Sequence, residues 1–74
     1  MNARKVPITD EAIGALVRER RWAADMGQPQ LGQALGVSEQ MIQKYETGQS
    51  PLTVVKLVKI AETLGCKTLD LIPC

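Results

Sequence analysis

The sequence predicts an all-α fold, a compact domain of five helices, and three kinds of local signal support this. Apolar residues recur three and four positions apart, which is the spacing of one helix face. Serine or threonine precedes periodic segments and glycine follows them, as expected at helix starts and ends. Residues 9–74 are therefore expected to form one domain. Residues 1–8 contain Pro7 and no periodicity, which predicts a flexible, extended arm.

The first helix is expected to begin at Thr9 or Asp10, either of which can cap it. Asp10 and Glu11 then place negative charge at the positive end of the helix dipole. The apolar stripe of this helix consists of Ile13, Leu16, Val17 and Ala24.

The second helix is expected over residues 28–35. Leu31 and Leu35 are four positions apart, so both point to the same side of this helix. Gly36 follows, and glycine permits the positive φ that a sharp helix stop requires. The chain is therefore expected to turn tightly at this point.

A third helix is expected over residues 39–46, because Ser38 is a good N-cap. Ile42 and Tyr45 are three positions apart and face the core. The opposite face is left to Glu39, Gln40, Gln43 and Lys44. Two short helices joined by a tight turn, the second with an exposed polar face, form a helix-turn-helix.

The remainder of the chain predicts a fourth helix and a short fifth one. Residues 47–51 are a turn signal, and Thr53 can cap a helix that Gly65 ends. Its apolar residues repeat at helical spacing and are Leu57, Ile60, Ala61 and Leu64. Residues 68–72 can form one final turn or two.

This pattern resembles the DNA-binding domain of the Cro and phage-repressor family, also called the xenobiotic-response-element type. The resemblance runs from about Ile13 to Ile72 and implies a lambda-repressor-like fold. Gly32 departs from the family, which usually has alanine there. The residues that carry the resemblance are Gln28, Leu31, Gly32, Leu35, Gly36, Val37, Ser38, Ile42, Tyr45, Glu46, Gly48, Leu57, Ile60, Ala61, Leu64 and Gly65.

The resemblance implies that the third helix lies in the major groove of duplex DNA. The residues then expected to read bases are Glu39, Gln40, Gln43 and Lys44. Glutamine can pair with adenine, lysine can donate to guanine, and glutamate can accept from cytosine. Alternatively, glutamine is simply a good surface helix former. Glu39 also suits the positive N-terminus of its own helix, so electrostatics alone would explain it.

Contacts to the DNA backbone are expected around this helix. The resemblance assigns Gln28 to gripping a phosphate and bracing the reading helix, and a helix N-terminus supplies free N–H groups for an anion. Alternatively, Gln28 is an exposed polar helix start. The full set of expected backbone contacts is Gln28, Ser38, Thr47, Gln49, Ser50, Arg4 and Lys5.

The resemblance also implies a structural ion pair between Arg21 in the first helix and Glu46 at the end of the third. This pair is expected to orient the third helix without contacting bases. Arg18 and Arg20 are expected to lie on a solvated helix face or to add local positive charge.

Composition is compatible with DNA binding but does not indicate it. The 74 residues carry a formal net charge of only +1. With no histidine and two cysteines, Cys66 and Cys74, a four-ligand zinc site within one chain is excluded, and no metal or cofactor is expected. Both cysteines are interpreted as free thiols in a reducing cytoplasm, with an intermolecular disulfide or redox switch as the alternative. No signal peptide or membrane span is evident, so a cytoplasmic protein, bacterial or phage-encoded, is expected.

The function predicted from these features is to bind an operator in DNA and thereby to block or recruit RNA polymerase. The chain shows no effector-binding domain, no small-molecule effector site and no catalytic constellation, so an enzyme is not expected. The leading hypothesis is a dimeric transcriptional regulator, such as a repressor, a Cro-like protein or a restriction–modification controller. The alternative is a protein-interaction module such as an antitoxin.

A homodimer on a pseudo-palindromic operator is expected, because a single helix-turn-helix reads too few base pairs to find one site in a genome. Apolar residues near the C-terminus are expected to form the dimer contact, namely Leu69, Leu71 and Ile72. Alternatively, these residues cap the core of the monomer.

Overall fold

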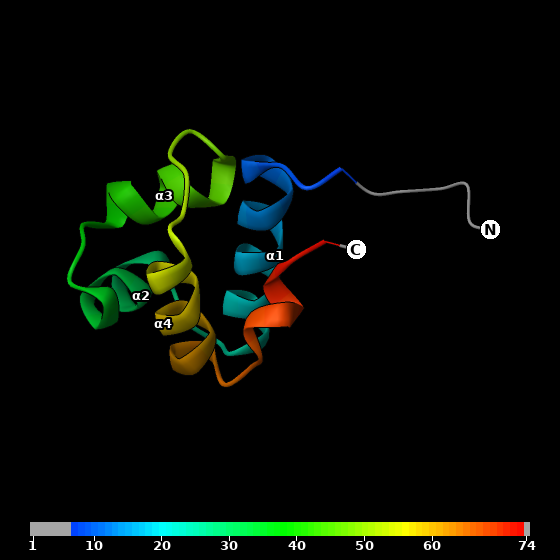
Figure 1. Ribbon diagram of the computed structural model, residues 1–74. Coiled ribbons are helices and arrows are strands. Elements are labelled where there is room, and N and C mark those ends of the chain that lie inside the picture. The colour runs from blue at the N-terminus through cyan, green and yellow to red at the C-terminus, as the bar shows by residue number, and fades with distance from the viewer. Residues whose placement is uncertain (1–6, 74) are drawn as a thin grey trace.

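The computed structural model describes residues 7–73 and confirms the all-α class. In chain order the elements are α1 (Asp10–Ala23), α2 (Gln28–Leu35), α3 (Glu39–Thr47), α4 (Val54–Leu64) and the short helix η1 (Thr68–Leu71). The fifth predicted helix is thus a single 3₁₀ turn. Figure 1 shows α2 and α3 on one side of the molecule and α1 on the other, with α4 in front.

The helix starts follow the predicted capping residues. Thr9 Oγ1 accepts a hydrogen bond from the Ala12 N–H at 3.0 Å, and Ser38 Oγ accepts one from Met41 at 3.1 Å. Thr53 caps α4 in the same way, at 3.1 Å from the Lys56 nitrogen. Each bond satisfies a backbone donor that the helix itself leaves unpaired. The predicted starts of α1, α3 and α4 are therefore confirmed.

The core is aliphatic and gathers residues from every element. Its fully buried members include Val17 of α1, Leu31 of α2, Ile42 of α3 and Ile60 of α4. Tyr45 is the aromatic residue of this core, whereas the ring of Trp22 is exposed. Because the core draws on all elements, the position of α3 is fixed by packing as well as by the turn before it.

The short helix η1 corrects one of the expected dimer residues. Leu71 is completely buried (0% exposed) within the monomer core, whereas Leu69 is 72% exposed. A residue with no accessible surface cannot contact a second copy, so the assignment of Leu71 to a dimer contact is wrong. A 3₁₀ helix turns about 120° per residue, so residues two apart point in different directions.

α1 crosses α3 in close contact at Gly14. A Cβ at this position would lie 2.6 Å from the carbonyl oxygen of Glu46 and closer still to that of Tyr45. Both of these atoms belong to the backbone of α3, so only glycine allows the two helices to approach this closely. Within residues 7–73, no helix is long and apolar enough to cross a membrane.

Candidate nucleic-acid interface

The turn between α2 and α3 sets the angle at which α3 is presented. Gly36 ends α2 in the left-handed conformation, with φ +73°. The Val37 N–H then donates to the Gly32 carbonyl at 2.9 Å, which closes the turn. Ser38 begins α3 immediately afterwards. The predicted helix-turn-helix of α2 and α3 is therefore present, with its stop and its restart where the sequence indicated.

The exposed face of α3 carries the predicted base-reading residues. Ile42, Tyr45 and Glu46 are buried on the inner side of this helix. The side chains left exposed to solvent are Glu39, Gln40, Gln43 and Lys44. Amide and ammonium groups can both donate hydrogen bonds, and the amides can also accept them. This face therefore offers the donor and acceptor chemistry that base edges require.

A buried ion pair anchors the C-terminal half of α3 to α1. Arg21 donates to both carboxylate oxygens of Glu46, from Nε to Oε2 at 2.6 Å and from Nη2 to Oε1 at 2.9 Å. The remaining guanidinium nitrogen, Nη1, donates to the Met26 carbonyl at 3.0 Å. Arg21 and Glu46 are only 6% and 2% exposed. The planar guanidinium thus fixes the loop after α1 and the end of α3 in one arrangement.

Two further side chains converge on the same carboxylate. Gln28 Nε2 donates to Glu46 Oε1 at 3.1 Å, and Arg18 Nε lies 3.5 Å from that oxygen. Burial alone would raise the pKa of Glu46. The hydrogen bonds from Arg21 and Gln28 and the charges of Arg21 and Arg18 outweigh it, so the pKa falls below its ordinary value. For Arg21, the hydrogen bond to Glu46 raises the pKa further and keeps the guanidinium charged.

Gln28 joins the N-terminus of α2 to α3. Its side chain is half-buried, and one amide N–H is used by Glu46, which leaves the other N–H as a donor. Pro29 follows in the first turn of α2 and has no N–H, so one backbone donor that an anion could use is missing there. The N-terminus of α2 therefore offers an anion fewer backbone N–H groups than an ordinary helix. The side-chain amide of Gln28 is then the main additional donor for an anion at this helix start.

The last turn of α3 and the loop after it are closed by their own hydrogen bonds. Thr47 Oγ1 donates back to the Gln43 carbonyl at 2.9 Å. The N–H groups of Gln49 and Ser50 both donate to the Lys44 carbonyl, at 2.9 and 3.3 Å. Contacts from this loop to a phosphate would therefore come from side chains. Arg4 and Lys5, the other expected backbone contacts, lie outside the described residues.

Cys66 is a free, half-buried thiol, and Cys74 lies outside the described residues. Burial raises the pKa of the Cys66 thiol, although the Arg20 charge acts in the opposite direction. Within residues 7–73, no three His, Cys, Asp or Glu side chains gather closely enough to hold a metal ion.

Sequence reasoning missed two residues of this region. Gly14 is required by the close crossing of α1 and α3. Arg18 was expected to lie on a solvated face or to add local positive charge, and its contact with the Glu46 carboxylate was not predicted. The spacing of Arg18 and Arg21, three apart on α1, places them on one helix face and could have indicated a shared partner. Nothing local to Gly14 indicates its role.

Comparison with known proteins assigns this arrangement to a family. A family model described as helix-turn-helix matches residues 8–71 of the chain. The chain belongs to the helix-turn-helix family of the Cro and phage-repressor type. An uncharacterised transcriptional regulator from the ATPase CF(0) region of Rhodospirillum rubrum is 38% identical to it over 64 residues, which is 86% of this chain and 59% of that protein. The chain spans about half the length of the curated helix-turn-helix relatives it matches.

Solved structures of helix-turn-helix regulators share the fold. The clp gene regulator ClgR from C. glutamicum superposes with a TM-score of 0.82 at 26% identity, covering 89% of this chain and 86% of ClgR. The restriction–modification controller protein C.AhdI from Aeromonas hydrophila gives a TM-score of 0.78 at 26% identity, covering 84% of this chain and 90% of that one.

Proposed function

We propose that this helix-turn-helix chain is the DNA-binding unit of a bacterial or phage-encoded transcriptional regulator, acting in the cytoplasm with α3 in the major groove of its operator. One observation carries the proposal. The helix α3, which exposes the polar face, is held at its C-terminal end by the buried ion pair of Glu46 with Arg21, so the residues that would read bases stand on a rigid support. Side chains that must discriminate base pairs need such fixed positions. No catalytic role is proposed.

Each exposed residue of α3 has a part in this proposal. Gln40 and Gln43 suit adenine, Lys44 suits guanine, and Glu39 accepts from cytosine or simply favours the helix dipole. Ser38, Gln49 and Ser50 flank this face and, with Gln28, Arg4 and Lys5, would contact the DNA backbone. Thr47 would do so only by turning its single O–H away from the Gln43 carbonyl.

Binding to a duplex selected from random DNA tests the function. Anisotropy titrations should show clear preference for the selected duplex over a scrambled one. Log affinity should fall linearly with log salt, with a slope of about one per phosphate contacted, because bound phosphates release counterions. Equal affinity for both duplexes at moderate salt would reject a specific regulator.

The alternative, a protein-interaction module such as an antitoxin, is favoured by one observation. Val54, Val55 and Val58 of α4 are all exposed, the first at 73%. An apolar helix face of this kind is typical of contacts between proteins. The DNA titration separates the two functions, since a module of this class need not distinguish the two duplexes.

Alanine variants of α3 test the base readers. We expect Gln40→Ala and Lys44→Ala each to cost about 1–3 kcal/mol in binding the selected duplex and to relax the preference at particular base pairs. Lys59→Ala on the exposed face of α4 removes the same charge as Lys44→Ala away from α3 and serves as a control. An unchanged selected motif for Gln40→Ala would show that another face of α3 reads DNA.

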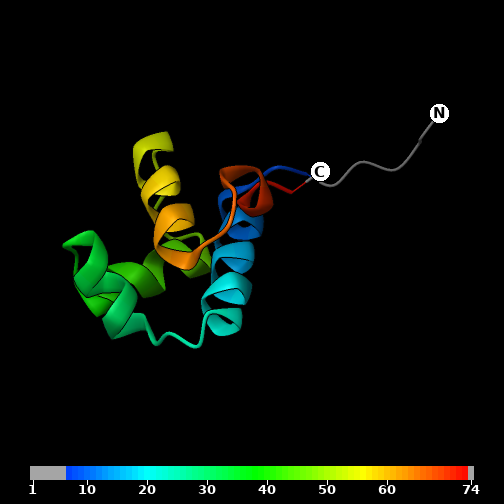
Figure 2. The ribbon, with the colours of Figure 1, turned by 90° about the horizontal axis from the view of Figure 1, so that it is seen from below.

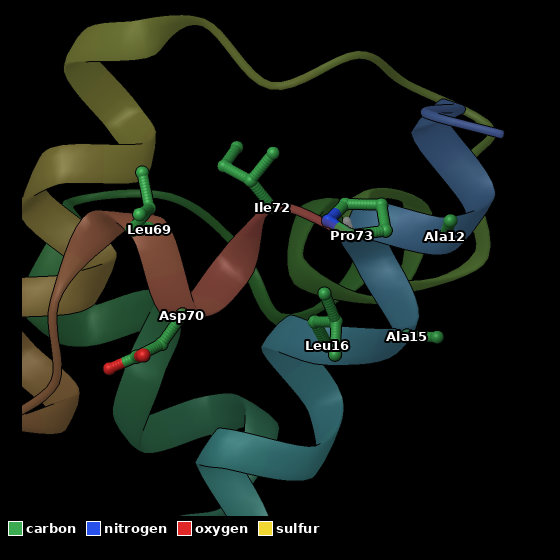
Figure 3. A pocket seen from close by; sticks show the side chains of 7 residues that line it. All are labelled: Ala12, Ala15, Leu16, Leu69, Asp70, Ile72 and Pro73. Carbon is green, nitrogen blue, oxygen red and sulfur yellow. The ribbon is translucent and has the colours of Figure 1, made fainter. Parts of the chain in front are cut away.

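We further propose that the chain acts as a homodimer on a pseudo-palindromic operator, which brings a second reading helix to the DNA about 34 Å from the first. Leu69 and half-buried Ile72 support a contact at the C-terminal end. Figure 3 shows them beside an open depression of about 540 Å³. Leu69 lies on one side of this depression, and Ala12 and Ala15 of α1 lie on the other. A second copy would cover this apolar surface.

Leu69→Asp tests the dimer without disturbing the core, because the Leu69 side chain is exposed in the monomer. We expect sedimentation equilibrium to show a dimer for the wild type at tens of micromolar and a monomer for the variant, because the charge would be buried at the contact. Val55→Asp, at an exposed position of α4, is the matched control. Circular dichroism monitors the folding of each variant. A wild type that stays monomeric, even on its operator, would contradict the dimer.

A further inference from the structure

The exposed tryptophan of α1 has no part in the core or in the α3 reading face. Trp22 is 62% exposed near the end of α1. Two guanidinium groups lie near its ring, with the Cζ atoms of Arg18 and Arg21 each 5.9 Å from the ring centroid. A large aromatic ring left in solvent beside two cations is a feature that folding alone does not require.

The position of this ring relates it to the candidate nucleic-acid interface. Arg18, Arg21 and Gln28 all contact the Glu46 carboxylate, so Trp22 flanks the cluster that joins α1, α3 and the N-terminus of α2. Figure 2 shows the C-terminal end of α1 and its loop to α2 along one edge of the molecule, opposite α4. Trp22 therefore lies next to two arginines that share the Glu46 carboxylate with Gln28, for which a phosphate contact is proposed.

The chemistry of the cluster favours an anion. Arg18 and Arg21 carry two positive charges against the single negative charge of Glu46. Arg21 uses Nε, Nη1 and Nη2 internally, but Arg18 makes one 3.5 Å contact and its side chain is 37% exposed. Arg18 therefore retains N–H groups for a ligand, and within residues 7–73 the indole Nε1–H of Trp22 donates to no acceptor.

We propose that Trp22 and Arg18 form an additional contact to the DNA backbone. The indole Nε1–H donates to a phosphate oxygen, and Arg18 supplies the charge. The aromatic ring holds the Arg18 guanidinium in place through a cation–π contact. This inference rests on the proposed function and extends the DNA contact surface from α2 and α3 onto the end of α1. Phosphate contacts position a protein without reading sequence, so this contact adds affinity and not specificity.

Intrinsic fluorescence tests the inference directly, because Trp22 is the only tryptophan in the chain. DNA binding is followed separately by the anisotropy of a labelled selected duplex. Saturation with this duplex should lower the acrylamide quenching constant of Trp22 by about two-fold or more, because a ring against the backbone loses contact with solvent. Binding without protection of Trp22 would overturn this inference alone. Absence of binding would overturn the proposed function and this inference with it.

Two variants separate the roles of the charge and the indole N–H. Arg18→Gln should reduce the slope of log affinity against log salt by about one, whereas Lys59→Gln, the same charge change on α4, should leave it unchanged. Trp22→Phe keeps an aromatic ring at this position and removes the N–H donor, so affinity should fall about five-fold for selected and scrambled duplexes alike. Thermal melts establish that each variant is folded. An unchanged slope for Arg18→Gln, or a loss for Trp22→Phe confined to the selected duplex, would contradict the proposed contact.

Discussion

Gly14→Ala should lower the free energy of unfolding by about 2 kcal/mol, although alanine is the better helix former. A methyl group at this position would lie 2.6 Å from the Glu46 carbonyl oxygen and closer still to that of Tyr45. Neither backbone atom can move without shifting α3 relative to α1. Overpacking against two backbone atoms should cost about 3 kcal/mol, the upper end of the usual range, and the roughly 1 kcal/mol that alanine gains in helix propensity offsets only part of this cost.

Urea unfolding followed by far-UV circular dichroism measures this change, and the melting temperature should fall by about 10 °C or more. Ala15→Gly, at the next and exposed position of α1, supplies the control. This variant measures the difference in helix propensity between alanine and glycine at a position away from the close contact of α1 with α3. It should cost about 1 kcal/mol. If Gly14→Ala instead raised the stability by that amount, the crossing of α1 and α3 would be looser than the structure indicates.

The limits of the helices could be predicted from the sequence because they depend on local chemistry. Ser38 and Thr53 begin α3 and α4 by accepting a hydrogen bond from the residue three positions ahead. Gly36 and Gly65 end α2 and α4 in the left-handed conformation. Each of these signals lies within one helical turn of the boundary that it sets, so neighbouring residues suffice to identify it.

Features that depend on distant residues could not be predicted in this way. The need for glycine at position 14 arises from α3, more than thirty positions along the chain. Leu69 and Leu71 were assigned to one surface, but the 3₁₀ geometry of η1 buries one and exposes the other. The resemblance supplied the pairing of Arg21 with Glu46, whereas the contact of Arg18 with the same carboxylate appears only in the structure.

Arg21→Ala should have the largest effect on stability, a loss of about 3–5 kcal/mol. The Glu46 carboxylate would stay buried without its bidentate partner, and an uncompensated buried charge carries a cost of this size. A domain of this length is stabilised by only about 4–11 kcal/mol in total, so the variant should lose a large part of this stability and melt well below the wild type. Circular dichroism melts measure this directly. Arg20→Ala is the control, because Arg20 lies next in sequence and makes only a 3.8 Å surface contact with Asp70.

The ion pair should also give the stability of the protein a specific dependence on pH. The pKa of Glu46 is lowered in the folded state, so its contribution is complete above the ordinary glutamate pKa of about 4.3. That contribution is lost as the pH falls through the lower folded-state pKa, where folded and unfolded chains are both protonated. The gap in unfolding free energy between the wild type and Glu46→Gln should therefore be constant from pH 7 to about pH 5 and shrink below it. Urea titrations across this range measure the gap. A gap that stays constant down to pH 3 would show that Glu46 stabilises α3 by packing and not by its charge.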